Sequence, residues 1–233
     1  LLKLSDKLAK VMAGMSEKFE IVFVDDGSLD DTPAVLRRIH NNDKRIWNTR
    51  IEKNVGRMDA LSRHLPRVRG QIIVTFGTHS DPEYIPQLVE KLKEGYDLVN
   101  GNRIGFKRAG VPRLLATTVN TLCRGLSGAH IGDFSSAFRA FRRELLDLSP
   151  AEDNFMLTPI LAAWVNHKVS EVSVPRADDR SKRSFVVDYR DLFWAMGSVC
   201  QLLLILVANN LASLIVRVDA PPTSLSRHSP NQI

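Results

Sequence analysis

The sequence predicts an α/β protein with a mostly parallel sheet that is flanked by helices. Two observations support this fold class. Short runs of β-branched and aromatic residues alternate with longer amphipathic stretches up to residue 101, and this alternation is typical of parallel strands joined by crossover helices. The runs IVFV at 21–24 and IIVTF at 72–76 are almost wholly apolar, as strands buried on both faces are. The 233 residues, 44% of them hydrophobic, are enough for one sizeable core.

The elements of the first half follow from local patterns. Residues 1–15 place leucine, valine and methionine at helical spacing, which predicts an amphipathic helix. A strand at 21–26 is followed by Asp30, Asp31 and Thr32 as candidate caps and by Pro33, which together start the next helix. We then expect strands at 47–51, 71–76 and 96–100 and helices at 58–68 and 82–92.

The second half is predicted to contain helices at 111–126 and 158–164 and a strand at 168–175, with an arginine-rich segment at 134–148. Residues 192–216 carry no formal charge and are long enough to span a bilayer, although serine, glutamine and asparagine lower their hydropathy. A transmembrane helix and an interfacial or buried helix therefore both remain open. We expect an α/β domain at 1–190, this membrane-associated or transmembrane helix at 191–218, and a disordered Pro/Ser-rich tail at 219–233.

The net charge of +6 suits anionic partners such as nucleotides or phospholipid headgroups, although a solvated basic surface would give the same value. A nucleic-acid-binding domain is not favoured, because the basic residues are dispersed and match no known nucleic-acid-binding motif. The two cysteines, Cys123 and Cys200, are far apart and indicate neither a metal site nor a disulfide framework. A reducing compartment is the simpler expectation.

Ligands of open parallel sheets bind at the carboxyl ends of the strands, and the first candidate loop follows the strand at 21–26. Asp25 and Asp26 can accept hydrogen bonds from base N–H groups and ribose hydroxyls. Gly27 permits a turn with positive φ. The alternative is that the two carboxylates only cap the next helix.

Two further loops fall at predicted strand ends. The turn at 53–57 could contact a diphosphate through backbone amides and Arg57, or it could be a surface turn. In the loop at 77–82, His79 and Asp81 could offer one nitrogen and one oxygen ligand to a metal. Alternatively, Asp81 caps the helix that begins at Pro82.

Several motifs occur together in one order. They are EIVFVDDGSLDDT at 20–32, Asn54 with Gly56, GQIIVT at 70–75, DPEYIPQLVEKL at 81–92, EGYDLVNGNR at 94–103 and DFSSAFRAFRREL at 133–145. The chain resembles the family 2 glycosyltransferases of the GT-A fold over residues 5–195. The polyprenyl-phosphate branch is the most similar, with its dolichyl-phosphate mannosyltransferases and undecaprenyl-phosphate formamido-arabinose transferases. The resemblance implies a membrane-associated enzyme on the cytoplasmic face, which transfers a sugar from a nucleotide sugar to a polyprenyl phosphate.

The resemblance also implies roles for individual residues. Asp25, Asp26 and Gly27 would hold the base and ribose, and Asn54, Gly56 and Arg57 would lie near the diphosphate. In the acceptor loop, Asp133, Ser135, Ser136 and Arg139 match the family, and an arginine would grip the lipid phosphate. Arg176, Ser181 and Lys182 match a later signature. A phosphate monoester is already nucleophilic and anionic, so such a site needs cations more than a general base.

The sequence departs from the family at the metal site. The family's Asp-x-Asp motif, which binds a divalent metal and the sugar diphosphate, should follow residues 70–75. Here that stretch is about two residues short and holds Asp81 as its one carboxylate. Mg²⁺ or Mn²⁺ prefers oxygen ligands, so an Asp and a His are a poor substitute. A strand that the family places before the first helix is also expected but is not in the sequence. The alternative to an active transferase is therefore a degenerate or truncated relative that binds a nucleotide or partner without turnover.

Overall fold

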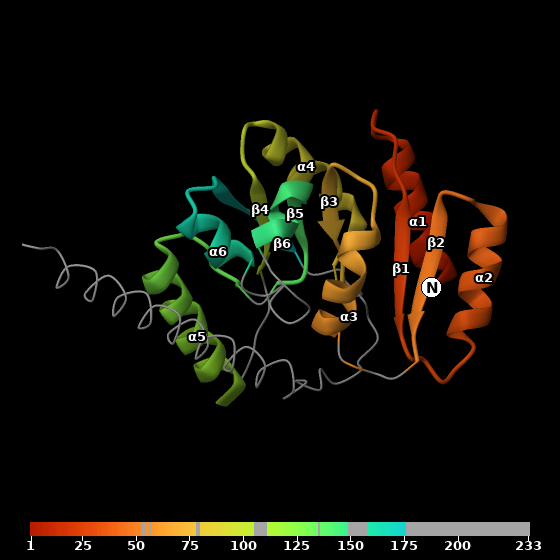
Figure 1. Cartoon of the computed structure of the whole chain (residues 1–233), viewed down its shortest axis with the longest axis horizontal. Coiled ribbons are helices and arrows are strands. Elements are labelled where there is room, and N and C mark those ends of the chain that lie inside the picture. The colour runs from red at the N-terminus through yellow and green to blue at the C-terminus, as the bar shows by residue number, and fades with distance from the viewer. Residues whose placement is uncertain are drawn as a thin grey trace, which may run out of the picture. The chain divides into compact units, whose positions relative to one another are not determined.

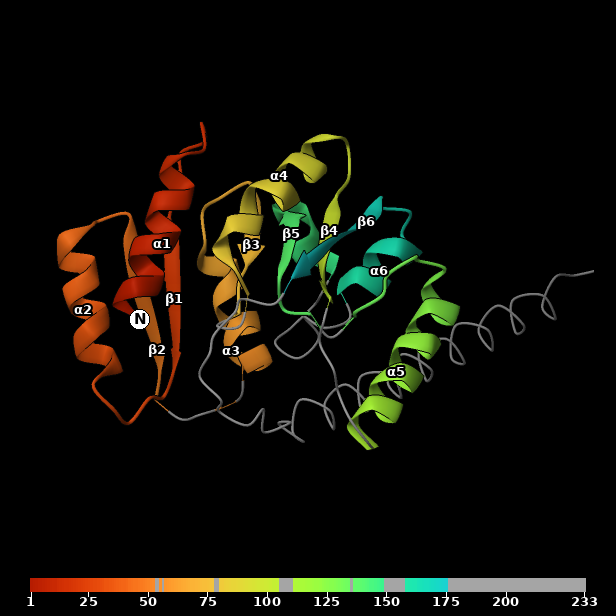
Figure 2. The ribbon, with the colours of Figure 1, turned by 180° about the vertical axis from the view of Figure 1, so that it is seen from behind.

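The computed structural model describes residues 1–52, 55, 57–77, 80–104, 111–134, 136–148 and 158–175. The chain divides into two compact units, Leu1–Ser198 and Val199–Ile233, and all described residues belong to the first. Figure 1 shows their helices and strands, and Figure 2 shows the same ribbon from behind.

The N-terminal elements form a two-stranded parallel sheet with helices beside it. They are α1 (Leu2–Ala13), β1 (Ile21–Asp26), α2 (Thr32–Asn42), β2 (Ile46–Ile51), α3 (Arg57–His64) and the 3₁₀ turn η1 (Leu65–Arg67). β1 and β2 pair in parallel from Ile21 opposite Ile46 to Asp26 opposite Ile51. α2 starts after Asp31 with a proline in its first turn, and it packs Leu36 and Ile39 against Ile46.

The remaining elements build a four-stranded sheet. They are β3 (Ile72–Thr75), η2 (Pro82–Tyr84), α4 (Ile85–Lys93), β4 (Leu98–Ile104), α5 (Val111–Ser127), β5 (Arg139–Arg142), η3 (Arg143–Leu148), α6 (Thr158–Trp164) and β6 (Val169–Pro175). The strand order is β3-β5-β4-β6. β4 and β6 are parallel, whereas β5 runs antiparallel to both of its neighbours.

The predicted α/β architecture is confirmed, and the helices and strands predicted up to residue 175 are present within a few residues of their expected ends. The expectation of one mostly parallel sheet needs two corrections. The described strands form two sheets, and an antiparallel strand, β5, lies inside the second. β5 comes from the arginine-rich segment, where Arg139 is fully buried, so its sequence lacks the apolar run that marks the other buried strands.

The largest core lies under α1 and α4. Leu88 and Leu92 of α4 pack with Val99 of β4 and Phe138, and Leu8 of α1 joins the same cluster. α1 is also tied to the segment after β3, because Lys7 Nζ lies 2.8 Å from an Asp81 carboxylate oxygen. These contacts hold the amphipathic first helix against the second sheet.

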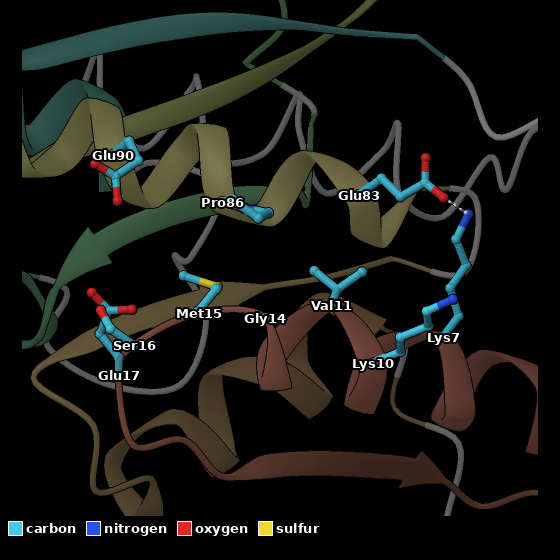
Figure 3. A pocket seen from close by; sticks show the side chains of 10 residues that line it. All are labelled: Lys7, Lys10, Val11, Gly14, Met15, Ser16, Glu17, Glu83, Pro86 and Glu90. Atoms are coloured by element: carbon cyan, nitrogen blue, oxygen red, sulfur yellow. Dashed lines mark ion pairs between the residues drawn. The ribbon is translucent and has the colours of Figure 1, made fainter.

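An open groove of about 770 Å³ runs between α1 and α4 (Figure 3). Val11, Met15 and Pro86 form its apolar part. Four of its charged side chains form ion pairs: Lys7 with Glu83 at one end, and Glu17 and Glu90 with Lys93 at the other. The groove is therefore part of the packing between two helices, and Lys7 at one end connects it to Asp81.

Within the described ranges, no helix is both long enough and apolar enough to cross a membrane. The predicted hydrophobic helix at 191–218 and the predicted tail at 219–233 lie outside those ranges.

Candidate functional site

Asp25 is the one buried residue of β1, and one oxygen of its carboxylate accepts a hydrogen bond within the protein. Its side chain is 1% exposed, and its Oδ1 accepts a 2.9 Å hydrogen bond from the backbone N–H of Ser28. Its Oδ2 is buried without a hydrogen-bond partner, and the Nε of Arg50 lies 3.7 Å away. A buried polar atom without a hydrogen bond is costly. This oxygen is therefore suited to accept an N–H or O–H from a ligand.

Asp26 and Gly27 shape the loops around that carboxylate. Asp26 Oδ1 accepts a 2.8 Å hydrogen bond from the backbone N–H of Val55, which joins the loop after β1 to the loop after β2. Gly27 has a φ of 72°, the left-handed conformation that its sequence context predicts and that glycine adopts without strain. The backbone of Arg57 begins α3. Asn54 and Gly56 lie outside the described residues.

The loop before β5, residues 131–137, is held by side chains from several elements. Carbonyls along the loop accept side-chain hydrogen bonds: Ile131 from Arg124 Nε at 2.6 Å, Asp133 from Asn100 Nδ2 at 2.9 Å, and Ala137 from Thr75 Oγ1 at 2.6 Å. Because these partners come from α5, β4 and β3, the loop is fixed to the body of the domain and not only to its neighbours in sequence.

Asp133 points its carboxylate at a cation. Its two oxygens accept hydrogen bonds from Arg103, with Nε to Oδ2 at 2.6 Å and Nη2 to Oδ1 at 3.0 Å. Such a bidentate pair fixes the carboxylate and guanidinium planes relative to each other, and it is stronger than a single hydrogen bond. The Arg103 side chain is 25% exposed, so its charge faces the surface beside the loop. Ser135 lies outside the described residues, whereas Ser136 is buried.

Arg139, the arginine predicted to contact the lipid phosphate, lies in the interior of the domain. Its side chain has no exposed surface, and it donates to Asn100 Oδ1 at 3.0 Å and to the carbonyl of Phe134 at 2.5 Å. Burial lowers the pKa of the guanidinium to about 9, with Asp133 opposing that shift, so it remains a cation at neutral pH. Its hydrogen bond to the Phe134 carbonyl supports the loop before β5.

Asp81 adopts the capping alternative. Its Oδ1 accepts from the backbone N–H of Glu83 at 3.1 Å, at the start of η2, and from Lys7 Nζ at 2.8 Å. His79 lies outside the described residues. In the part of the chain that the structure describes, no group of three His, Cys, Asp or Glu side chains is arranged to hold a metal ion. The described donor set of this loop therefore does not fit a divalent cation.

Comparison with known proteins places this geometry in a family. The family described as Glycosyl transferase family 2 matches residues 3–148, which is more than half of the chain. The chain belongs to glycosyl transferase family 2. The resemblance predicted from its motifs is thereby confirmed.

Relatives within family 2 are longer than this chain. An undecaprenyl-phosphate 4-deoxy-4-formamido-L-arabinose transferase from Proteus mirabilis (strain HI4320) is 26% identical over 191 residues, or 79% of this chain and 59% of the relative. A protein of the same name from Enterobacter sp. (strain 638) is 30% identical over 179 residues, or 74% of this chain and 55% of the relative. The chain thus spans little more than half the length of these curated relatives.

Solved structures support the GT-A fold. Glucosyl-3-phosphoglycerate synthase from Mycobacterium tuberculosis, in complex with phosphoglyceric acid, has a TM-score of 0.64 at 19% identity and covers 85% of this chain and 73% of its own. Its complex with Mn²⁺, uridine diphosphate and phosphoglyceric acid has a TM-score of 0.61 at 20% identity, covering 94% and 74%. At this identity the likeness establishes the fold alone.

Several residues of this family 2 site have no signal in the sequence pattern. They are Arg50, Asn100, Arg103, Asn120 and Glu171, which are scattered over β2, β4, α5 and β6. Asn100 and Arg103 lie inside a motif that carries the resemblance, but of the two only Arg103 could have been singled out, as a cation near a strand end. Of the predicted residues, Arg176 and Lys182 lie outside the described ranges.

Proposed function

We propose that this chain binds a nucleotide sugar and transfers the sugar to a polyprenyl phosphate at the cytoplasmic face of a membrane. One observation carries the proposal: Asp25 holds a buried carboxylate oxygen without a hydrogen-bond partner at the carboxyl end of β1. Membership of family 2 supports glycosyl transfer. The relatives named undecaprenyl-phosphate 4-deoxy-4-formamido-L-arabinose transferase support a lipid phosphate as acceptor.

On the donor side, Asp25 Oδ2 accepts a hydrogen bond from the nucleoside. Asp26 acts through Val55 by ordering the loop after β2, where Asn54, Gly56 and Arg57 contact the ribose or diphosphate. Gly27 lets the chain turn so that Asp25 can also take the N–H of Ser28. A pocket with these bonds made in advance loses little entropy when the nucleotide binds.

On the acceptor side, the loop at 131–137 receives the lipid phosphate, with Ser135 as a contact and with Arg176 and Lys182 as cations. One phosphate oxygen attacks the anomeric carbon, a carbon–oxygen bond forms there, and the nucleoside diphosphate leaves with the bonding electrons of the old bond. The attacking phosphate needs no general base because it is already ionised. Arg103, which is paired with Asp133, offsets the negative charge of the donor and the acceptor. Arg139 supports the loop through its hydrogen bond to the Phe134 carbonyl.

The test is transfer from labelled nucleotide sugars to lipid in membranes that contain the protein. The native chain should give a chloroform-extractable labelled product, and Asp25→Asn should reduce it strongly because one acceptor oxygen becomes a donor. Arg38→Ala on the exposed side of α2 is the matched control. Two results would count against the proposal. One is that Asp25→Asn forms as much lipid product as the native chain, and the other is that no common donor gives a lipid product with Mg²⁺ or Mn²⁺.

A second function is favoured by the loop after β3. Asp81 is used by η2 and Lys7, so a non-catalytic relative that binds a nucleotide without turnover fits the same donor pocket. The double variant Gly77→Asp/His79→Asp restores two carboxylates to this loop. If it gains metal-dependent nucleotide binding that the native chain lacks, the native protein is the non-catalytic form. If native binding already responds to Mn²⁺, the enzyme is favoured.

A further inference from the structure

Asn120 of α5 holds the backbone on both sides of Asp133. Its Nδ2 donates to the carbonyl of Gly132 at 3.1 Å, and its Oδ1 accepts from the backbone N–H of Phe134 at 3.2 Å. One side chain therefore brackets one residue, and both polar atoms of the amide are in use. Only a group with a donor and an acceptor on the same planar head can make this pair of bonds.

The bracket is reinforced from the opposite side by β6. Glu171 Oε2 accepts from the backbone N–H of Gly132 at 2.5 Å, and its Oε1 accepts from Asn102 Nδ2 at 2.7 Å. Gly132 thus has its N–H bound to β6 and its carbonyl bound to α5. A Cβ on Gly132 would lie 2.7 Å from Asn102 Nδ2. There is therefore no room for a side chain at this position unless Asn102 moves.

Fixing these peptide groups fixes what the Asp133 side chain can do. The Asp133 backbone is set by Asn120 on both sides, and its carboxylate then meets Arg103 through two hydrogen bonds of 2.6 and 3.0 Å. Arg103 is the partly exposed cation of this group. An error of about 1 Å in the loop would separate this bidentate pair.

We infer that Asn120 is a positioning residue: through the peptide groups around Asp133, it orients Arg103 toward the phosphate of the acceptor. The inference rests on the proposed function and adds to it a residue outside the predicted site. It also assigns a role to α5, whose Asn120 and Arg124 both bind the backbone of this loop.

The experiment measures binding to the full chain in detergent micelles, with farnesyl phosphate as acceptor probe, farnesol as its phosphate-free control and UDP as donor probe. Asn120→Asp keeps the shape but replaces the donor with a carboxylate oxygen that faces the Gly132 carbonyl. We expect it to weaken farnesyl phosphate binding about tenfold, the effect of losing one buried hydrogen bond and opposing two acceptors. UDP binding should stay within about twofold of native. Thr121→Ala, an exposed neighbour on α5, should change neither.

A double-mutant cycle separates positioning from general loss of fold. If Asn120 acts through Asp133, Asp133→Asn and Asn120→Asp should weaken farnesyl phosphate binding by much less together than the product of their separate effects. Glu171→Gln provides a second, gentler variant with a smaller loss in the same direction. Multiplicative effects, or equal losses for UDP and farnesyl phosphate, would overturn the inference and leave the proposed function standing. A native chain that prefers farnesyl phosphate no more than farnesol would overturn both.

Discussion

Replacing Arg139 by lysine tests whether this residue supports the loop or contacts a ligand directly. The guanidinium is fully buried and makes hydrogen bonds to Asn100 and to the carbonyl of Phe134. A hydrogen bond with a charged partner contributes about 1.5–3 kcal/mol, and a single ammonium cannot reproduce the fork of a guanidinium. Losing one of these bonds should therefore lower the free energy of unfolding by about 1.5–3 kcal/mol.

For a domain of about 150–250 residues, each kcal/mol shifts the midpoint of thermal unfolding by about 2–4 °C. Arg139→Lys should then unfold roughly 3–12 °C below the native protein, as followed by far-ultraviolet circular dichroism. Arg38→Lys, the same change on the exposed side of α2, should shift the midpoint by less than about 1 °C. A native midpoint in Arg139→Lys, together with lost acceptor binding, would refute the supporting role and favour direct contact with phosphate.

Three further outcomes are expected. Gly101→Ala should cost about 1–3 kcal/mol in urea unfolding, because the added Cβ would lie 2.9 Å from a backbone carbonyl, whereas Gly125→Ala in α5 has open space and should be neutral or stabilising. Burial alone raises the pKa of Asp97, but the hydrogen bond from the Lys168 N–H and a nearby histidine and arginine outweigh it, so the pKa is lowered. Asp97 therefore stabilises the fold above its unfolded pKa of about 3.9 and loses that effect as pH falls through the folded value. In Asp97→Asn, the urea midpoint should therefore depend less on pH between about pH 5 and 2.5 than it does in the native protein. Burial raises the pKa of Cys123 to about 11, so peptide mapping should find it alkylated at about pH 8 only after denaturation.

Much of the fold could be predicted from the sequence because most elements carry a local pattern. The apolar runs that became β1 and β3 and the amphipathic runs that became α1 and α4 are visible in windows of a few residues. β5 could not be predicted in this way. Its residues RAFR place arginine at both ends, and Arg139 becomes buried only because Asn100 and the carbonyl of Phe134 accept its hydrogen bonds.

The residues of the candidate site also differ in whether a local sequence pattern marks them. Carboxylates at strand ends are local features, so Asp25 and Asp26 could be selected from the sequence, and the turn at Gly27 could be anticipated. The network around the loop at 131–137 could not, because Asn100, Asn120 and Glu171 lie far apart along the chain. Single polar residues in a strand or helix carry no sign of their partners, since those partners are set by tertiary packing.

The placement of β5 also affects the order in which the sheet can assemble during synthesis. β5 is the strand that pairs with β3 and separates it from β4, yet η2, α4, β4 and α5 are all made before it. β3 must wait for this late strand, and such non-local pairing is slow and leaves strand edges exposed. Variants that weaken β5 should therefore reduce the yield of folded protein in cells more than their equilibrium stability suggests.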